Sequence, residues 1–332
     1  MPATEKQINA SLLVEIFLAR RRLKNLVLRT PLIHSPALSK KTDCEIYLKM
    51  ECWQLTGSFK VRGAINMVSA LSKEEKDRGL VTTSSGNHGT ALAYAASILG
   101  HPPTRVYLPK YANRKKVEKI RSFGAEAVLF GENFFESLDE AQRYVKETNA
   151  TYVHSASHLH IIAGQGTIGL EVTEDLPDVD AVIVPIGGGG LISGISKAVR
   201  TINDRIRVIG VEPMAAQGAF LSLRDDRCYE RVENRQSVAD GLLGALTPLT
   251  FEISRNLVER VALLEEDEII DAMRVFQAEE QLMLEGSAVV GLAAILAKKV
   301  DVKGQKVVLI VTGRNIDAER YNKLINARQD FT

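Results

Sequence analysis

Short apolar runs recur along the chain and are separated by longer amphipathic segments. We interpret the runs as buried strands, because a strand covered on both faces is apolar throughout instead of alternating. The intervening segments have helical periodicity, as in 113–123, which Gly124 closes, and in 266–281. The predicted strands are EIYLKM (45–50), RVYLP (105–109), EAVLF (126–130), AVIVPI (181–186), RVIGVE (207–212) and KVVLIVT (306–312).

This alternation predicts an α/β fold with two open, twisted, mostly parallel sheets and flanking helices. The compact strand–helix stretch 73–156 predicts a small domain that carries a substrate loop. Residues 1–72 and 157–332 then form a large cofactor-binding domain. Ligands of open α/β sheets bind beyond the carboxyl ends of the strands, so the loops there are the first candidates for a site.

Composition narrows the function classes. The chain has 332 residues, of which 45% are hydrophobic and 25% charged, and a net charge of +1. This balance gives no electrostatic reason to expect nucleic acid or membrane binding. The three cysteines lack metal-type spacing, and the apolar runs are too short to span a bilayer. The polar N-terminus has no targeting pattern, so we expect a cytoplasmic protein.

Two loops have the composition of anion sites. Residues 84–89, SSGNHG, follow a predicted strand and precede a helix, and the alternative is a capped turn with Ser85 or Asn87 as N-cap. Residues 187–190 are four glycines between a strand and a helix, where backbone amides can wrap a phosphate monoester. A simple tight turn is the alternative, although it rarely needs four glycines.

Lys60, in LTGSFKVRGA (55–64), lies near a predicted helix start with Ser58 as N-cap. Lysines favour helix C-termini, and both the helix dipole and burial would favour a neutral amine here. A neutral amine can form a Schiff base with an aldehyde. The alternative is a solvated lysine tolerated at this position. Together, a reactive lysine, a phosphate loop and a polar substrate loop are the parts that a pyridoxal-phosphate enzyme needs.

The same stretches resemble a known family. They are GSFKVRGA (57–64), SSGNHGTALAYAA (84–96), GQGTIGLEV (164–172), the tetraglycine run and VADG (238–241). In this order, from RTPL (29–32) to TGRNID (312–317), the chain resembles the serine/threonine dehydratase and serine racemase family, which are pyridoxal-phosphate enzymes of fold type II. The resemblance implies pyridoxal 5'-phosphate as cofactor, an amino acid as substrate and a homodimer.

The resemblance also implies site residues. Lys60 would form the Schiff base and remove the Cα proton, and Ser85 matches the catalytic serine of racemases. The residues implied to bind the cofactor are Phe59, Lys60, Asn87, Gly187, Gly188, Gly189, Gly190, Leu191, Gly241, Glu285 and Thr312. Those implied to bind the substrate are Ser84, Ser85, Gly86, Asn87 and His88. A simple helix-capping acid is an equally good interpretation of Glu285.

Some positions depart from the family pattern. Arg314 replaces a glycine and could contact an extra substrate carboxylate, although a surface arginine is an equally good interpretation. Glu212 matches a racemase metal ligand, but Gly218 stands where the matching aspartate would be, so we expect no metal. His154, His158 and His160 have no Cys or acidic partner, and we interpret them as loop histidines. The basic run 114–121 has the pattern of a solvated helix face.

The sequence therefore predicts a dehydratase (ammonia-lyase) that converts a small β-hydroxy amino acid, threonine-like or serine-like, to a 2-oxo acid and ammonia. Three alternatives stay open: an amino-acid racemase, a specialised catabolic dehydratase of 3-hydroxyaspartate or a hydroxyectoine-derived substrate, and a non-catalytic binding protein that keeps the fold. The intact Lys60 and glycine run argue against the last of these.

Overall fold

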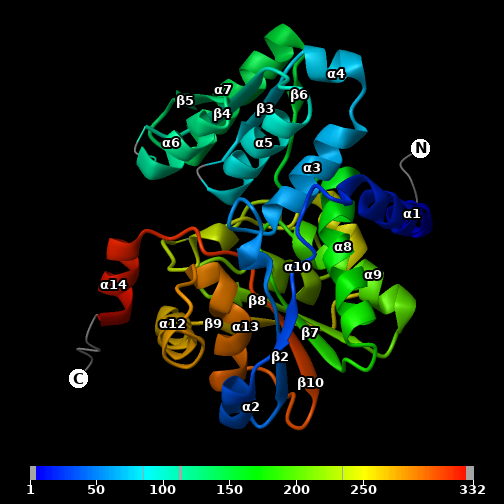
Figure 1. Ribbon diagram of the computed structural model, residues 1–332, viewed down its shortest axis with the longest axis vertical. Helices are drawn as coiled ribbons and strands as arrows, with labels where there is room; N and C mark the ends of the chain where they lie inside the picture. The colour runs from blue at the N-terminus through cyan, green and yellow to red at the C-terminus, as the bar shows by residue number, and fades with distance from the viewer. Residues whose placement is uncertain (1–4, 85, 111, 113, 234, 327–332) are drawn as a thin grey trace.

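The computed structural model describes residues 5–84, 86–110, 112, 114–233 and 235–326. In this part of the chain the strands form two sheets, one in the upper and one in the lower half of Figure 1. The larger has six strands in the order β1-β2-β10-β7-β8-β9, and the smaller has four in the order β5-β4-β3-β6. The β1–β2 pair is antiparallel, and the other pairs are parallel.

The larger sheet contains β1 (Leu32–His34), β2 (Glu45–Lys49), β7 (Ala181–Pro185), β8 (Arg207–Pro213), β9 (Arg260–Leu264) and β10 (Lys306–Ile310). The smaller contains β3 (Leu80–Thr83), β4 (Thr104–Leu108), β5 (Glu126–Leu129) and β6 (Thr151–Tyr152). The predicted α/β fold with two mostly parallel sheets is confirmed. The strand prediction did not include β1, β6 and β9, of which the first two are only three and two residues long.

The helices are α1 (Glu5–Leu23), α2 (Pro36–Thr42), α3 (Lys60–Ala70), α4 (Lys73–Asp77), α5 (Asn87–Ile98), α6 (Arg114–Ser122), α7 (Phe134–Thr148), α8 (Leu159–Asp175), α9 (Gly190–Ile202), α10 (Gly218–Arg224), α11 (Pro248–Ser254), α12 (Glu266–Glu280), α13 (Gly286–Leu296) and α14 (Ala318–Asn326). Two short 3-10 turns are η1 (Glu51–Trp53) and η2 (Asp240–Leu242). The predicted helices 113–123 and 266–281 appear as α6 and α12 with nearly the same bounds.

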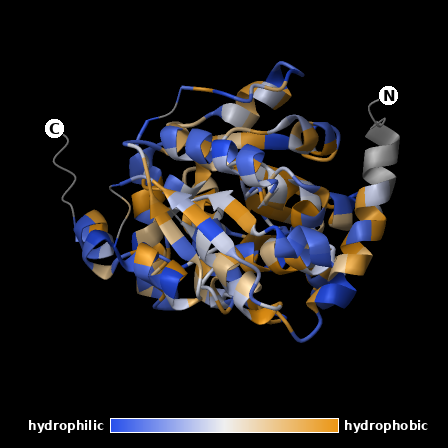
Figure 2. Cartoon of the chain, turned by 90° about the horizontal axis from the view of Figure 1, so that it is seen from above, coloured by the Kyte–Doolittle hydropathy of each residue, from blue (hydrophilic) through white to orange (hydrophobic). Residues whose placement is uncertain are grey.

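Apolar residues concentrate on the strands and on the helix faces that cover them, whereas blue polar residues dominate the outer helix faces in Figure 2. Every residue of β3 and β7 is buried, as expected for strands covered on both faces. Burial of these runs is the main favourable contribution to the fold. None of the helices within the described residues is long and apolar enough to cross a membrane.

Helix α3 lies where the two halves of the molecule meet, and it packs against α5 and α8 (Figure 1). All four strands of the smaller sheet fall within 73–156, the range that we predict for the small domain. The division at these boundaries remains a prediction. Because α3 begins with Lys60, the lysine stands at the junction between the two sheets.

Candidate active site

The helix that carries Lys60 begins differently from our prediction. Ser58 was expected to be the N-cap, and this is wrong: Phe59 occupies that position and makes no side-chain capping bond. Ser58 instead pairs with Gly313 in an isolated antiparallel bridge, and the Phe59 amide donates to the Thr312 carbonyl at 3.1 Å. The chain before α3 is therefore held by the segment that follows β10, a contact far away in sequence.

The amine of Lys60 is only weakly engaged by the protein. Its Nζ donates to the Ser155 carbonyl at 3.1 Å and lies 5.1 Å from the centroid of the Phe59 ring. Burial lowers the pKa of Lys60 from 10.5 to about 8, while the charge of Glu285 opposes the shift. The amine is thus much closer to its neutral, nucleophilic form than an ordinary lysine at neutral pH.

Two uncharged histidines accompany this amine. The Nε2 of His88 donates to the Val153 carbonyl at 3.0 Å, and the Nδ1 of His154 accepts the amides of Ala156 and Ser157 at 3.0 and 2.7 Å. Burial, reinforced by the charge of Lys60, lowers the pKa of His88 to about 3 and that of His154 to about 4. Both rings therefore add no positive charge to the site at neutral pH.

The glycine run forms the loop between β7 and α9. Only Gly189 has a left-handed backbone, with φ +82°, and a Cβ there would lie 2.5 Å from a methyl carbon of Leu246. At Gly188 and Gly190 a Cβ would approach Ala156 to 2.9 and 3.0 Å. Three of the four glycines thus serve close packing and not turn geometry, so a simple tight turn does not explain the run.

The position of this loop suits an anion. Gly190 and the buried Leu191 open α9, so the preceding amides lie at the positive end of a helix. Within the described residues the amides of Gly188 and Gly189 donate no hydrogen bond to the chain. Gly241, in η2, lies beside the run, because a Cβ on Gly187 would come within 3.1 Å of its carbonyl oxygen.

Asn87 begins α5 and faces the larger half of the molecule. Its Nδ2 donates to the Glu285 carboxylate at 2.8 and 3.1 Å, and its Oδ1 accepts from Asn315 Nδ2 at 2.7 Å. Burial raises the pKa of Glu285 to about 7, and the Asn87 hydrogen bond opposes the shift. Glu285 precedes α13 but makes no side-chain capping bond, so the interpretation as a helix-capping acid is wrong.

The predicted substrate loop 84–89 follows β3 and includes the first residues of α5, from Asn87 on. Gly86 is the N-cap of α5, so Asn87 is not the cap that the alternative interpretation required. The Ser84 hydroxyl accepts the Gly86 amide at 3.3 Å. Ser85, the predicted catalytic serine, lies outside the described residues. The catalytic and substrate-binding roles of this loop remain predictions.

Buried polar atoms without partners test whether the predicted cofactor fits. Thr312 is 2% exposed and Ser58 is fully buried, and neither hydroxyl has a hydrogen-bond partner in the described chain. An unsatisfied buried hydroxyl is costly, and a ligand bound here would supply the missing partner. With the open amides of the glycine loop and the amine of Lys60, they fit an aromatic aldehyde phosphate.

The basic run 114–121 is not simply a solvated face, and that prediction is wrong for Lys119. Its Nζ donates to the Thr56 carbonyl and to Asn315 Oδ1, both at 3.1 Å. Lys115 pairs with Asp317 at 2.6 Å, and Lys116 lines a pocket next to Glu285. Helix α6 thus closes against the segment after β10. The sequence carries no local signal for this, because helical spacing alone does not identify the partners.

Arg314 is exposed, which favours the surface interpretation over contact with a second substrate carboxylate. Glu212 is buried, and its two carboxylate oxygens accept the amides of Ala219 and Phe220 at 2.8 and 2.9 Å. The carboxylate therefore accepts backbone amides at the start of α10 that have no partner within the helix. Among the described residues no group of three or more His, Cys, Asp or Glu is arranged to hold a metal ion.

The comparisons with known proteins agree with this geometry. Residues 23–313 match the sequence model of a family described as "Pyridoxal-phosphate dependent enzyme". The chain is 46% identical over 309 residues to the L-threonine ammonia-lyase of Thermotoga maritima, covering 93% of this chain and 76% of that protein. It is 38% identical over 313 residues to the catabolic L-threonine dehydratase of Escherichia coli K12, covering 93% and 94%.

Solved structures give the same result. Maize serine racemase matches with a TM-score of 0.88 at 34% identity, covering 92% of this chain and 94% of that one. Threonine deaminase isoform 2 of Solanum lycopersicum matches with a TM-score of 0.89 at 31% identity, covering 95% and 87%. The family resemblance stated from the motifs is confirmed. The chain belongs to the pyridoxal-phosphate dependent enzymes of fold type II, among the threonine dehydratases and serine racemases.

Proposed function

We propose that this protein is a pyridoxal-phosphate-dependent ammonia-lyase that converts a small β-hydroxy amino acid, first of all L-threonine or L-serine, to a 2-oxo acid and ammonia. The observation that carries the proposal is the partly buried amine of Lys60, whose pKa is lowered to about 8. Sequence identity of 46% to the L-threonine ammonia-lyase of Thermotoga maritima supports the same activity.

The bound cofactor supplies an electron sink for the electrons released at the substrate Cα. In this proposal Lys60 Nζ would bond the cofactor and would hold the Cα proton. The amides of the glycine run 187–190 would hold the phosphate, and Phe59 and Gly241 would lie beside the ring. Thr312 Oγ1 would supply a hydroxyl to the ring nitrogen. The hydroxyl and amide groups of 84–88 orient the substrate carboxylate.

Neutral histidines and a weakly bonded lysine suit this proton transfer. A base works best when its pKa lies near the working pH, and the Lys60 pKa of about 8 meets this requirement. Charged rings at His88 and His154 would lower the basicity of the amine further, and burial keeps both uncharged. A racemase would need a second acid on the opposite ring face. Ser85 is the candidate, and maize serine racemase is similar at 34% identity.

The test combines labelling with product analysis. The protein is incubated with pyridoxal phosphate, reduced with borohydride and digested, and modified Lys60 is measured by mass spectrometry from pH 6 to 11. Because only the neutral amine reacts, we expect the labelling rate to rise up to about pH 8 and then to level off. The labelling rate of an ordinary lysine would continue to rise with pH up to its usual pKa of 10.5.

Lys60→Ala should abolish both the label and the release of 2-oxo acid from L-threonine. Lys197→Ala is the matched control, since burial also lowers the pKa of Lys197, which lies farther along α9 and is not among the predicted cofactor residues. Chiral analysis of recovered serine tests the alternative, because D-serine that appears faster than pyruvate would establish a racemase. Unlabelled Lys60 in a protein that releases no oxo acid would refute both activities.

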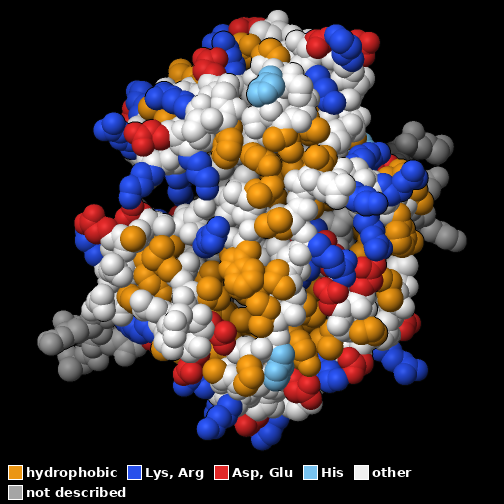
Figure 3. All heavy atoms as spheres, in the orientation of Figure 1, with side chains coloured by type: hydrophobic (Ala, Val, Ile, Leu, Met, Phe, Trp, Pro, Cys, Tyr) orange, Lys and Arg blue, Asp and Glu red, His pale blue; other side chains and the backbone are white. Residues whose placement is uncertain are grey.

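We also propose a cytoplasmic homodimer. Leu28, Trp53 and Leu55 are 45%, 37% and 51% exposed, and the Gln54 side chain bonds the Leu28 backbone, which brings them together. Apolar side chains also gather on the middle of the face drawn in Figure 3. Leu55→Glu should shift the sedimentation coefficient to that of a monomer. Ile202→Glu, at a similarly exposed apolar residue, is the control.

A further inference from the structure

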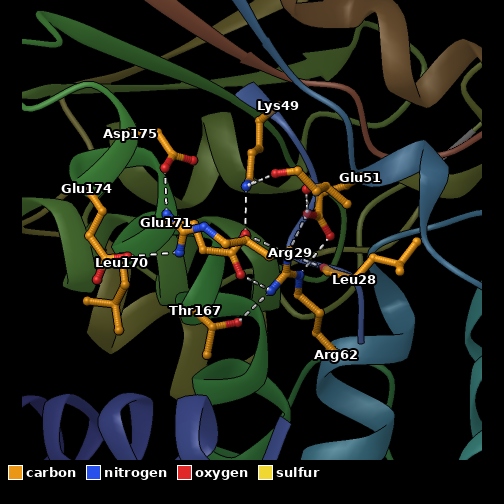
Figure 4. Close-up of polar contacts among 12 residues, drawn as sticks. Leu28, Arg29, Lys49, Glu51, Arg62, Thr167, Leu170, Glu171, Glu174 and Asp175 are labelled. Carbon is orange, nitrogen blue, oxygen red and sulfur yellow. Dashed lines mark hydrogen bonds and ion pairs between the residues drawn. The ribbon is translucent and has the colours of Figure 1, made fainter. Parts of the chain in front are cut away.

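Four charged side chains are packed together beside α3. Lys49, Glu51 and Arg62 are at most 1% exposed, and the side chain of Glu171 is 12% exposed. Two cations and two carboxylates balance in charge. Their closest ion pairs measure 2.6 to 2.7 Å, and Figure 4 shows Arg62 between the two carboxylates.

Arg62 is the centre of this group. It donates to Glu51 through Nε and Nη2 at 2.8 and 2.7 Å, and to Glu171 through Nη1 and Nη2 at 2.7 and 2.8 Å. The remaining contacts go to Thr167 Oγ1 at 3.2 Å and the Leu28 carbonyl at 3.3 Å. Lysine cannot reproduce two bidentate pairs, because only the planar guanidinium presents five donors in a rigid fork.

The partners come from separate parts of the chain. Glu51 lies in η1, Thr167 and Glu171 lie in α8, and Thr30 supplies further bonds to Glu51 and Lys49 at 2.5 and 2.6 Å. Thr30 belongs to the RTPL stretch, and Thr167 and Glu171 belong to the GQGTIGLEV stretch. The proposed chemistry gives neither stretch a role. Arg62 itself follows Lys60 by two residues in GSFKVRGA.

The geometry of α3 links this group to the amine. Side chains two residues apart leave an α-helix about 200° apart, so Arg62 and Lys60 extend from nearly opposite sides of the same turn. The N-terminus of α3 has no side-chain cap, and Lys60 forms no ion pair among the described residues. The first turn is therefore held through Arg62 on one side and through the Ser58–Gly313 bridge on the other.

We propose that Arg62 is a positioning residue for Lys60: through the buried carboxylates of Glu51 and Glu171 it holds the first turn of α3, and so the amine, at the cofactor site. This inference rests on the proposed role of Lys60 as the residue that bonds the cofactor. It assigns to Arg62 no contact with cofactor or substrate.

The test uses borohydride-trapped Lys60, measured by mass spectrometry at increasing pyridoxal phosphate concentration and at several pH values. Arg62→Lys keeps the charge but loses the fork, and we expect it to need about tenfold more pyridoxal phosphate for half-labelling. Its pH midpoint should also rise above the value of about 8, because a loosened first turn admits water to the amine. Thr167→Val removes only one hydrogen-bond partner of Arg62, and this variant should need about threefold more pyridoxal phosphate for half-labelling.

Val68→Ala is the matched control, since Val68 is a fully buried residue of the same helix outside this group. It should lower the melting temperature without moving the labelling curve or its pH midpoint. If Arg62→Lys does not fold, the labelling curves of Thr167→Val and Val68→Ala are compared instead, and this comparison decides. Labelling that follows only the melting temperature in all variants would overturn the inference. A wild type that is not labelled at Lys60 would instead refute the proposed function, and this inference with it.

Discussion

At the scale of single residues, the site combines a desolvated amine with hydroxyls that have no protein partner. Within the described chain the Lys60 amine donates a hydrogen bond only to the Ser155 carbonyl, and the Thr312 hydroxyl has no hydrogen-bond partner. Both features are unfavourable for the protein alone, because buried polar groups cost free energy when they are left unpaired. They become favourable when a ligand supplies the partner.

Thr312→Val should therefore separate stability from cofactor binding. We expect the free energy of unfolding of the cofactor-free protein to stay within about 1 kcal/mol of wild type or to rise, because an unpaired hydroxyl is removed. The dissociation constant of pyridoxal phosphate should increase about threefold to tenfold through the lost hydrogen bond. Urea unfolding and a fluorescence titration measure the two quantities.

Ser69→Ala removes another buried hydroxyl without a partner, near the end of α3, and serves as the control for Thr312→Val. It should leave cofactor affinity unchanged. Equal affinity in Thr312→Val and wild type would show that the Thr312 hydroxyl is not a ligand.

At the scale of elements, loops that join strands to helices hold the residues proposed to bind the phosphate and the substrate. The β7–α9 loop shows how glycine is used: one residue supplies a left-handed backbone, and its neighbours permit close contact with Ala156 and η2. A strand end delivers the loop, and a helix start provides the anion-binding amides. The same strand–loop–helix arrangement brings 84–88 to the beginning of α5.

Gly189→Ala tests this use of glycine. A left-handed alanine costs about 1 to 2 kcal/mol. Contact of its Cβ with Leu246 should add about 1 to 3 kcal/mol of strain. The control is Gly304→Ala, at φ +72° with nothing within 4 Å of the added carbon. Urea unfolding should show the larger loss for Gly189→Ala, with loss of pyridoxal phosphate binding in that variant only. Equal losses of stability in the two variants would contradict the close-packing argument.

At the scale of the whole molecule, the two sheets are joined around the site by polar contacts. Lys119, in α6, reaches Thr56 and Asn315, and Asn315 in turn bonds Asn87. Lys115 pairs with Asp317 nearby, but its side chain is 77% exposed. Exposed pairs contribute little and are screened by salt. The contact through the half-buried Lys119 should therefore matter more for bringing the substrate loop to the cofactor residues.

Lys119→Met and Lys115→Met measure this difference. We expect Lys119→Met to raise the KM for L-threonine about tenfold, since a charged hydrogen bond contributes about 1.5 to 3 kcal/mol. Lys115→Met should change KM less than about threefold, because surface pairs contribute at most about 1 kcal/mol. Steady-state kinetics of 2-oxo acid release gives both values. Similar effects of the two substitutions would show that α6 does not support the substrate loop.

Much of this architecture was predictable from local patterns. The apolar runs identified the main strands, because full burial requires side chains that are apolar on both faces. Lys60 near a helix start and the glycine run at a strand end were recognised for the same reason: the residues that define them are sequence neighbours. The strand β6 was missed because it has only two residues, and with it the loop whose Ser155 carbonyl meets Lys60.

The sequence by itself determined the fold class and singled out Lys60 and the glycine run for their proposed roles, since each depends on residues within a few positions of one another. Only the tertiary structure decided what holds them. The first turn of α3 is anchored by Glu171, 109 positions beyond Arg62, and not by a cap at Ser58. Lys119 finds its partner Asn315 196 positions away. Hydrogen bonds and ion pairs act over a few ångströms, so these partners are selected by how distant segments pack and not by their spacing along the chain.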